Sequence, residues 1–258
     1  MTVKSYDNFG NIILVRFPAG TKIKDKKKFA ERILKEQKGV RTILEKKEKI
    51  KGRLRKLSTN YIAGEKTKEV LYRENDCIFR FNIDDTYFSP RLSNERKEIS
   101  SKIKKNETVL VMFAGVAPFS IVIAKKSKAR KIFSNEINRK ANEYAELNIK
   151  LNKVKDRIEL ISGDANKIHE KLKQKMDVIV MPRPQLKDSF LKEAFLLSKK
   201  GTRIYYYDFC EIEKIDSIVE KIKEEARISG KKIKILQTKK AGEIAPYKIR
   251  LRVDFKIV

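Results

Sequence analysis

The chain has 258 residues, of which 62 are Lys or Arg and 34 are Asp or Glu, so its formal net charge is +28. Hydrophobic residues make up 41% of the sequence, which excludes a disordered basic tail, and the length excludes a miniprotein that depends on disulfides or a metal. Because folded chains of this charge commonly bind polyanions, nucleic acid is favoured as a partner over a membrane surface.

The two cysteines, Cys77 and Cys210, are far apart and lack the spacing of metal ligands, so we expect neither a disulfide framework nor a metal site. The single histidine, His169, is expected on a surface helix without a catalytic part. No stretch approaches the roughly 20 apolar residues of a membrane span, and the first residues lack the pattern of a signal peptide. These features predict a cytoplasmic protein that makes no contact with a membrane.

The first 83 residues have the pattern of a small α+β domain, predicted over 1–83. An apolar run at 8–17 is typical of a strand and ends at Pro18, and apolar residues at helical spacing predict a helix over 26–38. Short β segments separated by turns follow. The stretch 46–56 is dense in Lys and Arg, and with this net charge it fits phosphate contact and a solvated surface equally well.

Residues 84–104 are predicted to form a linker helix, which is entered through an aromatic turn at Pro90. Over 105–258, strand patterns alternate with helical patterns, which predicts an α/β domain with a mostly parallel sheet and a final hairpin-like pair. Strands are expected at 107–115, 128–136, 157–165, 176–182, 202–209, 231–240 and 247–258. Helices are expected at 118–126, 138–154, 188–201 and 217–230, the third of them ending at Gly201.

Small and acidic residues stand at the ends of three successive predicted strands, where open α/β sheets bind their ligands. The first strand ends in Ala114 and Gly115, which allow close approach of the backbone to a ligand, but the turn lacks the glycine spacing of a pyrophosphate loop. The second strand ends at Glu136, where a carboxylate can accept two ribose hydroxyls, and the third leads to Asp164. This order favours an adenosine pocket without phosphate recognition, and therefore S-adenosylmethionine.

Several motifs along almost the whole chain resemble one known family. The motifs are SYDNFGNIILVRFP (5–18), NYIAGE (60–65), YFSPRLSNER (87–96), VLVMFAGVAPFSI (109–121), NEINRKANEYAELNIKLNKV (135–154), SGDA (162–165) and APYKIRLRVDF (245–255). They are similar to those of the archaeal and eukaryotic tRNA (guanine(37)-N1)-methyltransferase family. One branch of that family also methylates C7 of the wyosine precursor 4-demethylwyosine at the same tRNA position.

The resemblance implies a class I S-adenosylmethionine-dependent methyltransferase domain, Rossmann-like with a mostly parallel seven-stranded sheet, after the small α+β domain. It implies methyl transfer to N1 of guanine 37, with the tRNA anticodon stem-loop as partner and S-adenosylmethionine as cofactor. A monomer is expected. The family often begins with a further small domain that docks on the tRNA elbow. Because this chain starts too late to contain it, RNA recognition is expected to rest on the basic small domain and the catalytic face.

The resemblance also implies roles for individual residues. Glu95 matches the proposed general base and Arg55 the catalytic arginine, which suits a reaction that removes the N1 proton and places negative charge on the ring. Two plainer interpretations stay open, namely that Glu95 pairs with Arg91 or a helix lysine and that Arg55 contacts only phosphate. The residues expected to bind the cofactor are Phe88, Arg96, Phe113, Ala114, Gly115, Val116, Glu136, Ile137, Asp164, Ala165 and Pro182.

Pro182 is also expected in the catalytic site, because it stands where family members usually have an asparagine that would hold the target base. Proline has no donor, so the base must be oriented by other groups. A roomier and less polar wall suits the larger tricycle, and we therefore predict activity on both acceptors. Candidates for base stacking are Tyr87, Phe88 and the run 205–207, for which a buried strand is the favoured interpretation. The run 231–240 fits phosphate contact and a solvated surface equally.

Two other functions stay open. An aminocarboxypropyl transferase of wyosine synthesis also binds S-adenosylmethionine, but such relatives tend to carry an aromatic residue where this chain has Pro118. A non-catalytic RNA-binding module would not need the acidic residues at 95, 136 and 164. A basic α/β protein unrelated to nucleic acid leaves the net charge of +28 unexplained.

Overall fold

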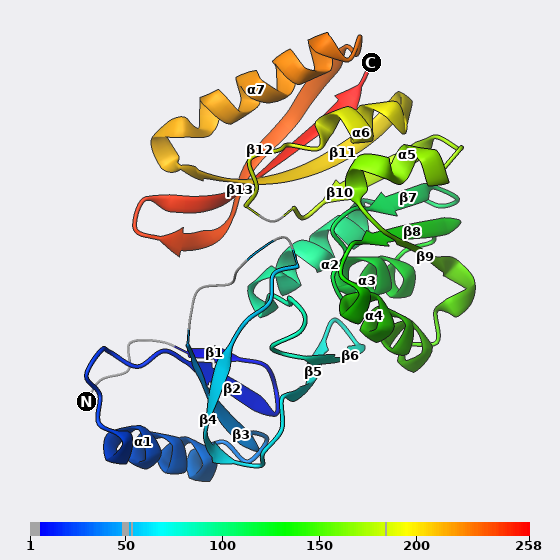
Figure 1. The fold of residues 1–258 in the computed structure, drawn as a ribbon. Helices are drawn as coiled ribbons and strands as arrows, with labels where there is room; N and C mark the ends of the chain where they lie inside the picture. The colour runs from blue at the N-terminus through cyan, green and yellow to red at the C-terminus, as the bar shows by residue number, and fades with distance from the viewer. Residues whose placement is uncertain (1–5, 48–51, 53, 184) are drawn as a thin grey trace.

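The computed structural model describes residues 6–47, 52, 54–183 and 185–258, so most of the basic stretch between 48 and 53 and Pro184 lie outside the described residues. Within these ranges the chain forms a four-stranded sheet, a two-stranded hairpin and a seven-stranded sheet (Figure 1). The hairpin and helix α2 (Ser93–Lys102) lie between the two larger sheets. This is the predicted α/β class preceded by a small α+β unit.

The small sheet has the strand order β1–β2–β3–β4, in which β2 and β3 are parallel and the outer pairs antiparallel. Its strands are β1 (Tyr6–Asn8), β2 (Ile12–Val15), β3 (Thr42–Lys46) and β4 (Thr59–Gly64). Helix α1 (Ile23–Glu36) covers one face because Phe29 and Ile33, four residues apart, bury against Ile43. From the other face, Ile12 and Leu44 enter the core that the hairpin shares with the large sheet.

The hairpin consists of β5 (Glu69–Glu74) and β6 (Cys77–Asn82) and is fastened to helix α4 (Arg139–Leu151). The amide side chain of Asn148 accepts a hydrogen bond from the backbone of Arg80 at 2.7 Å, and that of Asn152 accepts one from Ile78 at 2.9 Å. These bonds satisfy backbone groups at the free edge of the hairpin. Residues on both sides of the predicted boundary at 83 thus share one core, and the boundary itself stays a prediction.

The large sheet has the order β12–β13–β11–β10–β7–β8–β9, with all strands from β11 to β9 parallel and β13 antiparallel to both of its neighbours. The strands are β7 (Thr108–Val111), β8 (Lys131–Glu136), β9 (Ile158–Ser162), β10 (Met176–Met181), β11 (Ser198–Glu211), β12 (Ile233–Ala245) and β13 (Lys248–Ile257). Parallel strands bring their carboxyl ends to one edge, and that edge holds the site described below.

Helices cover both faces of this sheet, because successive side chains of a strand point to opposite sides. In β7, Val109 and Val111 enter the core formed with α2, α3 (Pro118–Lys126) and α4. Leu110 and Met112 enter the other core, formed with α5 (Ile168–Lys171), α6 (Leu191–Leu196) and α7 (Ile215–Ile228). None of the helices in the described part of the chain is long and apolar enough to span a membrane.

Several predicted elements differ from the structure in extent, and two of the differences have a clear physical reason. The strand predicted over 8–17 is divided into β1 and β2, because Gly10 has a φ of +80° and the Phe9 amide turns back to the carbonyl of Ile12. The helix predicted over 188–201 is limited to α6, and Gly201 lies inside strand β11. Strand pairing replaces the end of the predicted helix, because β11 already pairs with β10 at Ser198, opposite Met176.

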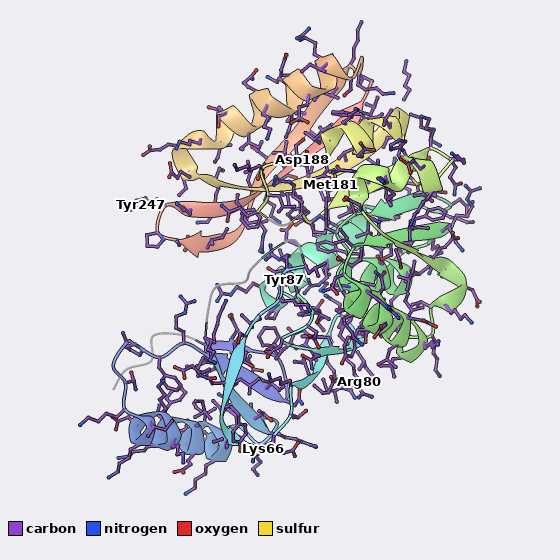
Figure 2. All side chains as sticks on the ribbon, viewed as in Figure 1. Lys66, Arg80, Tyr87, Met181, Asp188 and Tyr247 are labelled. Atoms are coloured by element: carbon purple, nitrogen blue, oxygen red, sulfur yellow. The ribbon has the colours of Figure 1, made fainter. Side chains whose placement is uncertain are left out.

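The β12–β13 hairpin extends past the sheet, and Tyr247 near its turn is 81% exposed (Figure 2). Ile244 of this hairpin and Phe9 of the small domain line one cavity, which also includes Tyr87. The run 205–207 is buried within β11, as the sequence favoured. His169 lies on the short helix α5, half-exposed, with its Nδ1 2.6 Å from a carboxylate oxygen of Glu193.

Candidate active site

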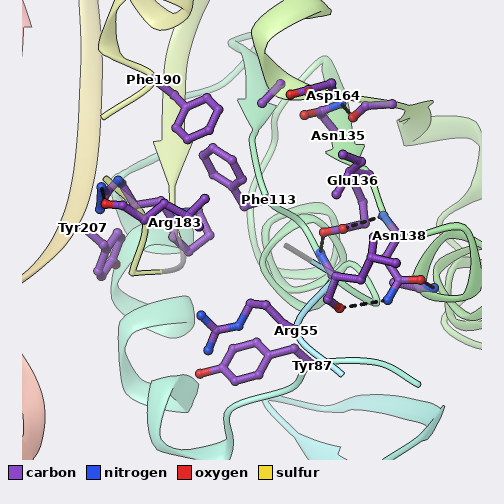
Figure 3. A pocket seen from close by; sticks show the side chains of 18 of the residues that line it. Arg55, Tyr87, Phe113, Asn135, Glu136, Asn138, Asp164, Arg183, Phe190 and Tyr207 are labelled. Carbon is purple, nitrogen blue, oxygen red and sulfur yellow. Dashed lines mark hydrogen bonds between the residues drawn. The ribbon is translucent and has the colours of Figure 1, made fainter. Parts of the chain in front are cut away.

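A pocket opens at the carboxyl ends of β7, β8, β9 and β10 (Figure 3). It is bounded by the small domain as well as by the sheet, because Leu54 and Arg55 line it from a segment before β4. Asn138 connects the two parts: its side-chain amide donates hydrogen bonds to the carbonyls of Leu54, at 3.2 Å, and Asp85, at 2.8 Å. The pocket therefore depends on residues that are distant in sequence.

Two backbone amides, one in the turn after β7 and one directly after β8, donate to Glu136 at the end of β8. The Gly115 amide donates to Glu136 Oε2 and the Asn138 amide to Oε1, both at 2.8 Å. Gly115 has a φ of +58°, and a Cβ there would lie 3.1 Å from the carbonyl oxygen of Tyr87, so a glycine suits this turn. Burial raises the pKa of Glu136, against the lowering effect of these amides. The carboxylate is thus held in one orientation, with lone pairs left for a ligand.

The opposite wall comes from the segment after β9. Gly163, Asp164 and Ala165 line the pocket there, together with Asn135 of β8. The side chain of Asn135 donates to the carbonyls of Ile161, at 2.8 Å, and Gly163, at 3.0 Å, which fixes the position of this segment. The Asp164 side chain accepts from the backbone amide of residue 166 at 3.1 Å. Two carboxylates from successive strands thus face one pocket.

Two arginines and a tyrosine form the floor of the pocket. The Arg55 guanidinium lies 3.8 Å from the centre of the Tyr87 ring, a cation–π contact, and Arg250 of β13 approaches the Tyr87 hydroxyl at 3.5 Å. Burial lowers the pKa of Arg55. Burial alone would raise the pKa of Tyr87, but the two guanidinium groups lower it below its ordinary value. Arg55 Nε is buried and has no hydrogen-bond partner among the described residues.

The segment between β10 and α6 closes the pocket with apolar side chains. Pro182, Leu186 and Phe190 line it, and Phe190 packs edge-on against Phe113 with ring centres 4.9 Å apart. Arg183 holds the segment in place, since its guanidinium donates to Asp208 at 2.9 Å and to the carbonyls of residues 186 and 188 at 2.7 and 2.8 Å. This wall of the pocket is therefore mostly apolar.

Glu95 lies in a buried cluster of charged residues beside the pocket. Its Oε2 accepts from the Tyr207 hydroxyl at 2.9 Å and from Arg252 Nη1 at 2.6 Å, and Lys239 Nζ is 3.1 Å from Oε1. Arg252 also binds Glu98 and Asp254. Hydrogen bonding to Arg252 lowers the pKa of Glu98 to about 2. Burial and the charge of Glu95 raise the pKa of Tyr207 well above its usual value.

The structure brings together most of the residues that the sequence singled out. Those that line the pocket are Arg55, Phe113, Gly115, Glu136, Ile137, Asp164, Ala165 and Pro182. Those that do not line it are Phe88, Glu95, Arg96, Ala114 and Val116. Their assigned roles stay predictions.

The residues outside the lining have other contacts. Phe88 stacks on Phe81 with ring centres 4.9 Å apart, inside the core of the hairpin. Arg96 is buried and forms a bidentate ion pair with Glu74, and it also donates to the carbonyl of residue 89 at 2.9 Å. Ala114 and Val116 are buried in the core beneath the turn. These four side chains support the pocket from behind.

Sequence reasoning missed the parts of the pocket that come from distant segments. Arg250 reaches it from the last strand, Leu54 from the small domain and Phe190 from the start of α6. No local motif marks them. Asn138 could have been found, because it directly precedes a helix whose first amides it accepts, at 3.0 Å from residue 140 and 3.4 Å from residue 141.

Comparison with known proteins identifies one matching family. Residues 70–236 match the family model of the TRM5/TYW2 methyltransferase domain. The chain is 35% identical over 254 residues to the tRNA (guanine(37)-N(1))-methyltransferase Trm5b of Pyrococcus abyssi, a match that covers 98% of this chain and 74% of that protein. The crystal structure of Trm5b superposes with a TM-score of 0.88 at 34% identity, covering 99% of this chain and 75% of that one.

Two further relatives match over a similar share of the chain. The chain is 32% identical over 306 residues to the tRNA (guanine(37)-N(1))/4-demethylwyosine(37)-methyltransferase Taw22 of Nanoarchaeum equitans, covering 98% of this chain and all of that protein. A solved complex of aTrm5 with tRNALeu superposes with a TM-score of 0.85 at 28% identity, covering 99% of this chain and 72% of that one. These matches confirm the fold class and the family predicted from the motifs. The chain belongs to the TRM5/TYW2 methyltransferase family.

Proposed function

We propose that this chain transfers a methyl group from S-adenosylmethionine to N1 of guanine at position 37 of tRNA. The observation that carries the proposal is the pocket, which combines the half-buried carboxylate of Glu136 with the half-buried guanidinium of Arg55 at the carboxyl ends of the parallel strands. The relatives Trm5b and Taw22 are both named as guanine-37 methyltransferases, and the chain covers at least 74% of each.

The residues of the pocket fit S-adenosylmethionine. Glu136 is held by two backbone amides and keeps lone pairs that can accept ribose hydroxyls. The turn at Gly115 lets the backbone approach the ligand, and Asp164 with Ala165 forms a wall suited to the adenine edge. When bound, S-adenosylmethionine supplies a methyl group on a positively charged sulfur. A pocket with two carboxylates on its adenosine side and without the glycine spacing of a pyrophosphate loop agrees with this cofactor.

The acceptor side supplies the charges that methyl transfer to N1 requires. Guanine N1 must lose its proton, and the negative charge that develops is shared with O6. Arg55 is the residue that we propose donates a hydrogen bond to that oxygen; its Nε–H, which is buried and has no partner in the described part of the chain, supports this role. A ligand oxygen there would remove an unsatisfied buried donor, which costs about 1–3 kcal/mol when left unpaired.

The same site accepts the tricyclic wyosine precursor at C7 as well. Pro182, Leu186 and Phe190 form an apolar wall where the usual family asparagine would provide a polar one. Such a wall selects the acceptor by shape rather than by a hydrogen bond, which suits a larger ring system. The relative Taw22, which carries both activities in its name, is matched over its entire length.

The experiment that tests these proposals is mass spectrometry of nucleosides after incubation with S-adenosylmethionine. Two tRNA substrates are compared, one with guanine and one with 4-demethylwyosine at position 37. One added methyl group on each is the expected result, and methylation of guanine alone would contradict the second activity. An added aminocarboxypropyl group, or bound cofactor without any product, would contradict the methyltransferase proposal and favour the two alternatives considered above.

The partner in this proposal is tRNA, bound through its anticodon stem-loop by a monomer in the cytoplasm. The net charge of +28 and the cavity between the small domain and the β12–β13 hairpin support an RNA surface next to the pocket. A relative, aTrm5, has been solved with tRNALeu. Light scattering of the free protein and of its tRNA complex measures the stoichiometry, and a mass of one chain per tRNA is expected.

A further inference from the structure

Glu95 cannot meet an acceptor base directly in the described conformation. Its side chain does not line the pocket. Both carboxylate oxygens are engaged, Oε2 by the hydroxyl of Tyr207 and by Arg252, and Oε1 by Lys239. A general base in this position needs an intermediate group to reach the pocket.

Tyr207 is that group. It lines the pocket beside Arg183 (Figure 3) and is fixed at its ring by an edge contact to Phe119, with ring centres 6.0 Å apart. Its hydroxyl donates to Glu95 Oε2 at 2.9 Å, and its oxygen, which also contacts Arg252, can take up a proton as the hydroxyl proton leaves. Among the described residues that line the pocket, Tyr207 alone forms a hydrogen bond with Glu95.

We propose that Tyr207 is a catalytic residue that relays the acceptor proton from guanine N1 to Glu95. This rests on the proposed function and adds a residue to its chemistry. The N1–H bond breaks as a new bond forms from that proton to Tyr207 Oη, while the original Oη proton moves to Glu95 Oε2. The electron pair left on N1 forms the bond to the methyl carbon, and the pair of the broken sulfur–carbon bond stays on sulfur.

The surrounding charges suit such a relay. Glu95, Glu98 and Asp254 are balanced by three cations, Arg252, Lys239 and Lys102. Each carboxylate of this buried cluster therefore has at least one cationic partner. Burial and the neighbouring carboxylate raise the pKa of Tyr207, so the phenol remains neutral and passes a proton without accumulating charge. Carboxylate and phenol therefore act as one unit.

The first test is the substitution Tyr207→Phe, which removes only the hydroxyl. Under single-turnover conditions with saturating tRNA, we expect the methyl-transfer rate on guanine to fall about 100-fold or more, as for loss of general base catalysis. The affinity for S-adenosylmethionine and the KM for tRNA should change less than about threefold. Tyr205→Phe is the matched control, because Tyr205 lies on the same face of β11 but does not line the pocket, and it should keep the wild-type rate.

The second test compares two carboxylates of the cluster and remains decisive if Tyr207→Phe does not fold. Glu95 and Glu98 both bind Arg252 and Lys239, but only Glu95 binds Tyr207. Glu95→Gln should lose at least about tenfold more rate than Glu98→Gln, and Glu95→Gln combined with Tyr207→Phe should be no slower than the slower single variant.

The outcomes separate this inference from the proposed function. A Tyr207→Phe enzyme that keeps the wild-type rate, equal losses in Glu95→Gln and Glu98→Gln, or multiplicative losses in the double variant would each overturn the relay while wild-type methylation stands. A wild-type protein that forms no methylated guanine would overturn both.

Discussion

Arg55 is the clearest case of a residue whose surroundings are incomplete without a ligand. Its guanidinium is stacked on Tyr87 and its Nε is buried without a partner in the described structure. Replacement by Ala should lower the single-turnover rate about 100- to 1000-fold, because the negative charge on the acceptor ring loses its donor. Binding of S-adenosylmethionine, measured by calorimetry, should change less than about threefold.

The control for this substitution is Arg41→Ala. Arg41 is also an arginine of the small domain, but its side chain is 67% exposed and pairs only loosely with Glu65, at 3.8 Å. It should leave the rate near that of the wild type. An Arg55→Ala enzyme that loses cofactor affinity and rate by the same factor would show that Arg55 serves binding instead of the chemical step.

Glu136 makes cofactor binding depend on pH. Its pKa is raised by burial, and only the ionised form can accept two ribose hydroxyls. As the pH falls through this raised pKa, the carboxyl is protonated and affinity for S-adenosylmethionine should fall, starting at a higher pH than for a carboxyl of ordinary pKa. Glu136→Gln should bind about 10- to 100-fold more weakly at neutral pH. Calorimetry between about pH 5 and pH 8 checks both statements.

In Glu136→Gln, the affinity for S-adenosylmethionine should no longer depend on pH in this range, because a glutamine amide does not titrate. If Glu136→Gln kept the pH dependence of the wild type, another group would be responsible. The carboxylate of Asp164, on the opposite wall, would then be the next residue to replace.

At the scale of elements, the turn between β7 and α3 controls how closely a ligand can approach the sheet. Gly115 has a φ of +58° and Ala117 one of +65°, so the chain reverses sharply before Pro118 begins the helix. Gly115→Ala places a Cβ 3.1 Å from the carbonyl oxygen of Tyr87 and adds left-handed strain of about 1–2 kcal/mol.

We therefore expect Gly115→Ala to weaken S-adenosylmethionine binding about tenfold and to lower the melting temperature by a few degrees. The loss arises because the amide that orients Glu136 is displaced. Gly39→Ala is the control, since a Cβ at Gly39 meets nothing within 4 Å. Equal cofactor affinity in Gly115→Ala and the wild type would contradict a close approach of the ligand to this turn.

At the scale of the whole molecule, electrostatics dominates the encounter with RNA. A net charge of +28 on a folded chain implies that binding releases many counterions from the phosphates. The affinity for tRNA should fall at least about tenfold between 50 and 200 mM salt, whereas the affinity for S-adenosylmethionine should change little. Filter binding across a salt series measures the first and calorimetry the second. A flat salt response for tRNA would contradict an electrostatic interface.

The two sheets are joined where the pocket lies, which explains why the small domain and the large domain both contribute to it. Asn138 binds carbonyls of residues 54 and 85, and the core beneath the pocket contains Ile12 of the small sheet and Val111 of the large one. Tyr87 lies in the region between the two sheets (Figure 2). Loosening the small domain should therefore impair methyl transfer as well as RNA binding.

Local patterns in the sequence were sufficient to predict the alternating strands and helices, the turn at Gly115 and the acidic residues Glu136 and Asp164 at strand ends. Periodicity of two or 3.6 residues and the position of a residue at a strand end are properties of neighbouring residues, so they can be read without a structure. They failed where long-range pairing overrode a local preference, as at 198–201, where β10 converts the end of a helical pattern into strand.

The relation between distant residues required the folded chain. Arg250 and Leu54 enter the pocket from opposite ends of the sequence, and Glu95 lies behind Tyr207 instead of in the pocket. Periodicity carries no information about which buried carboxylate faces a cavity, because that depends on how helix α2 packs against β11 and β13. The residue types of the site and their positions at strand ends could therefore be predicted from the sequence, whereas the path from the acceptor base to Glu95 depends on tertiary packing.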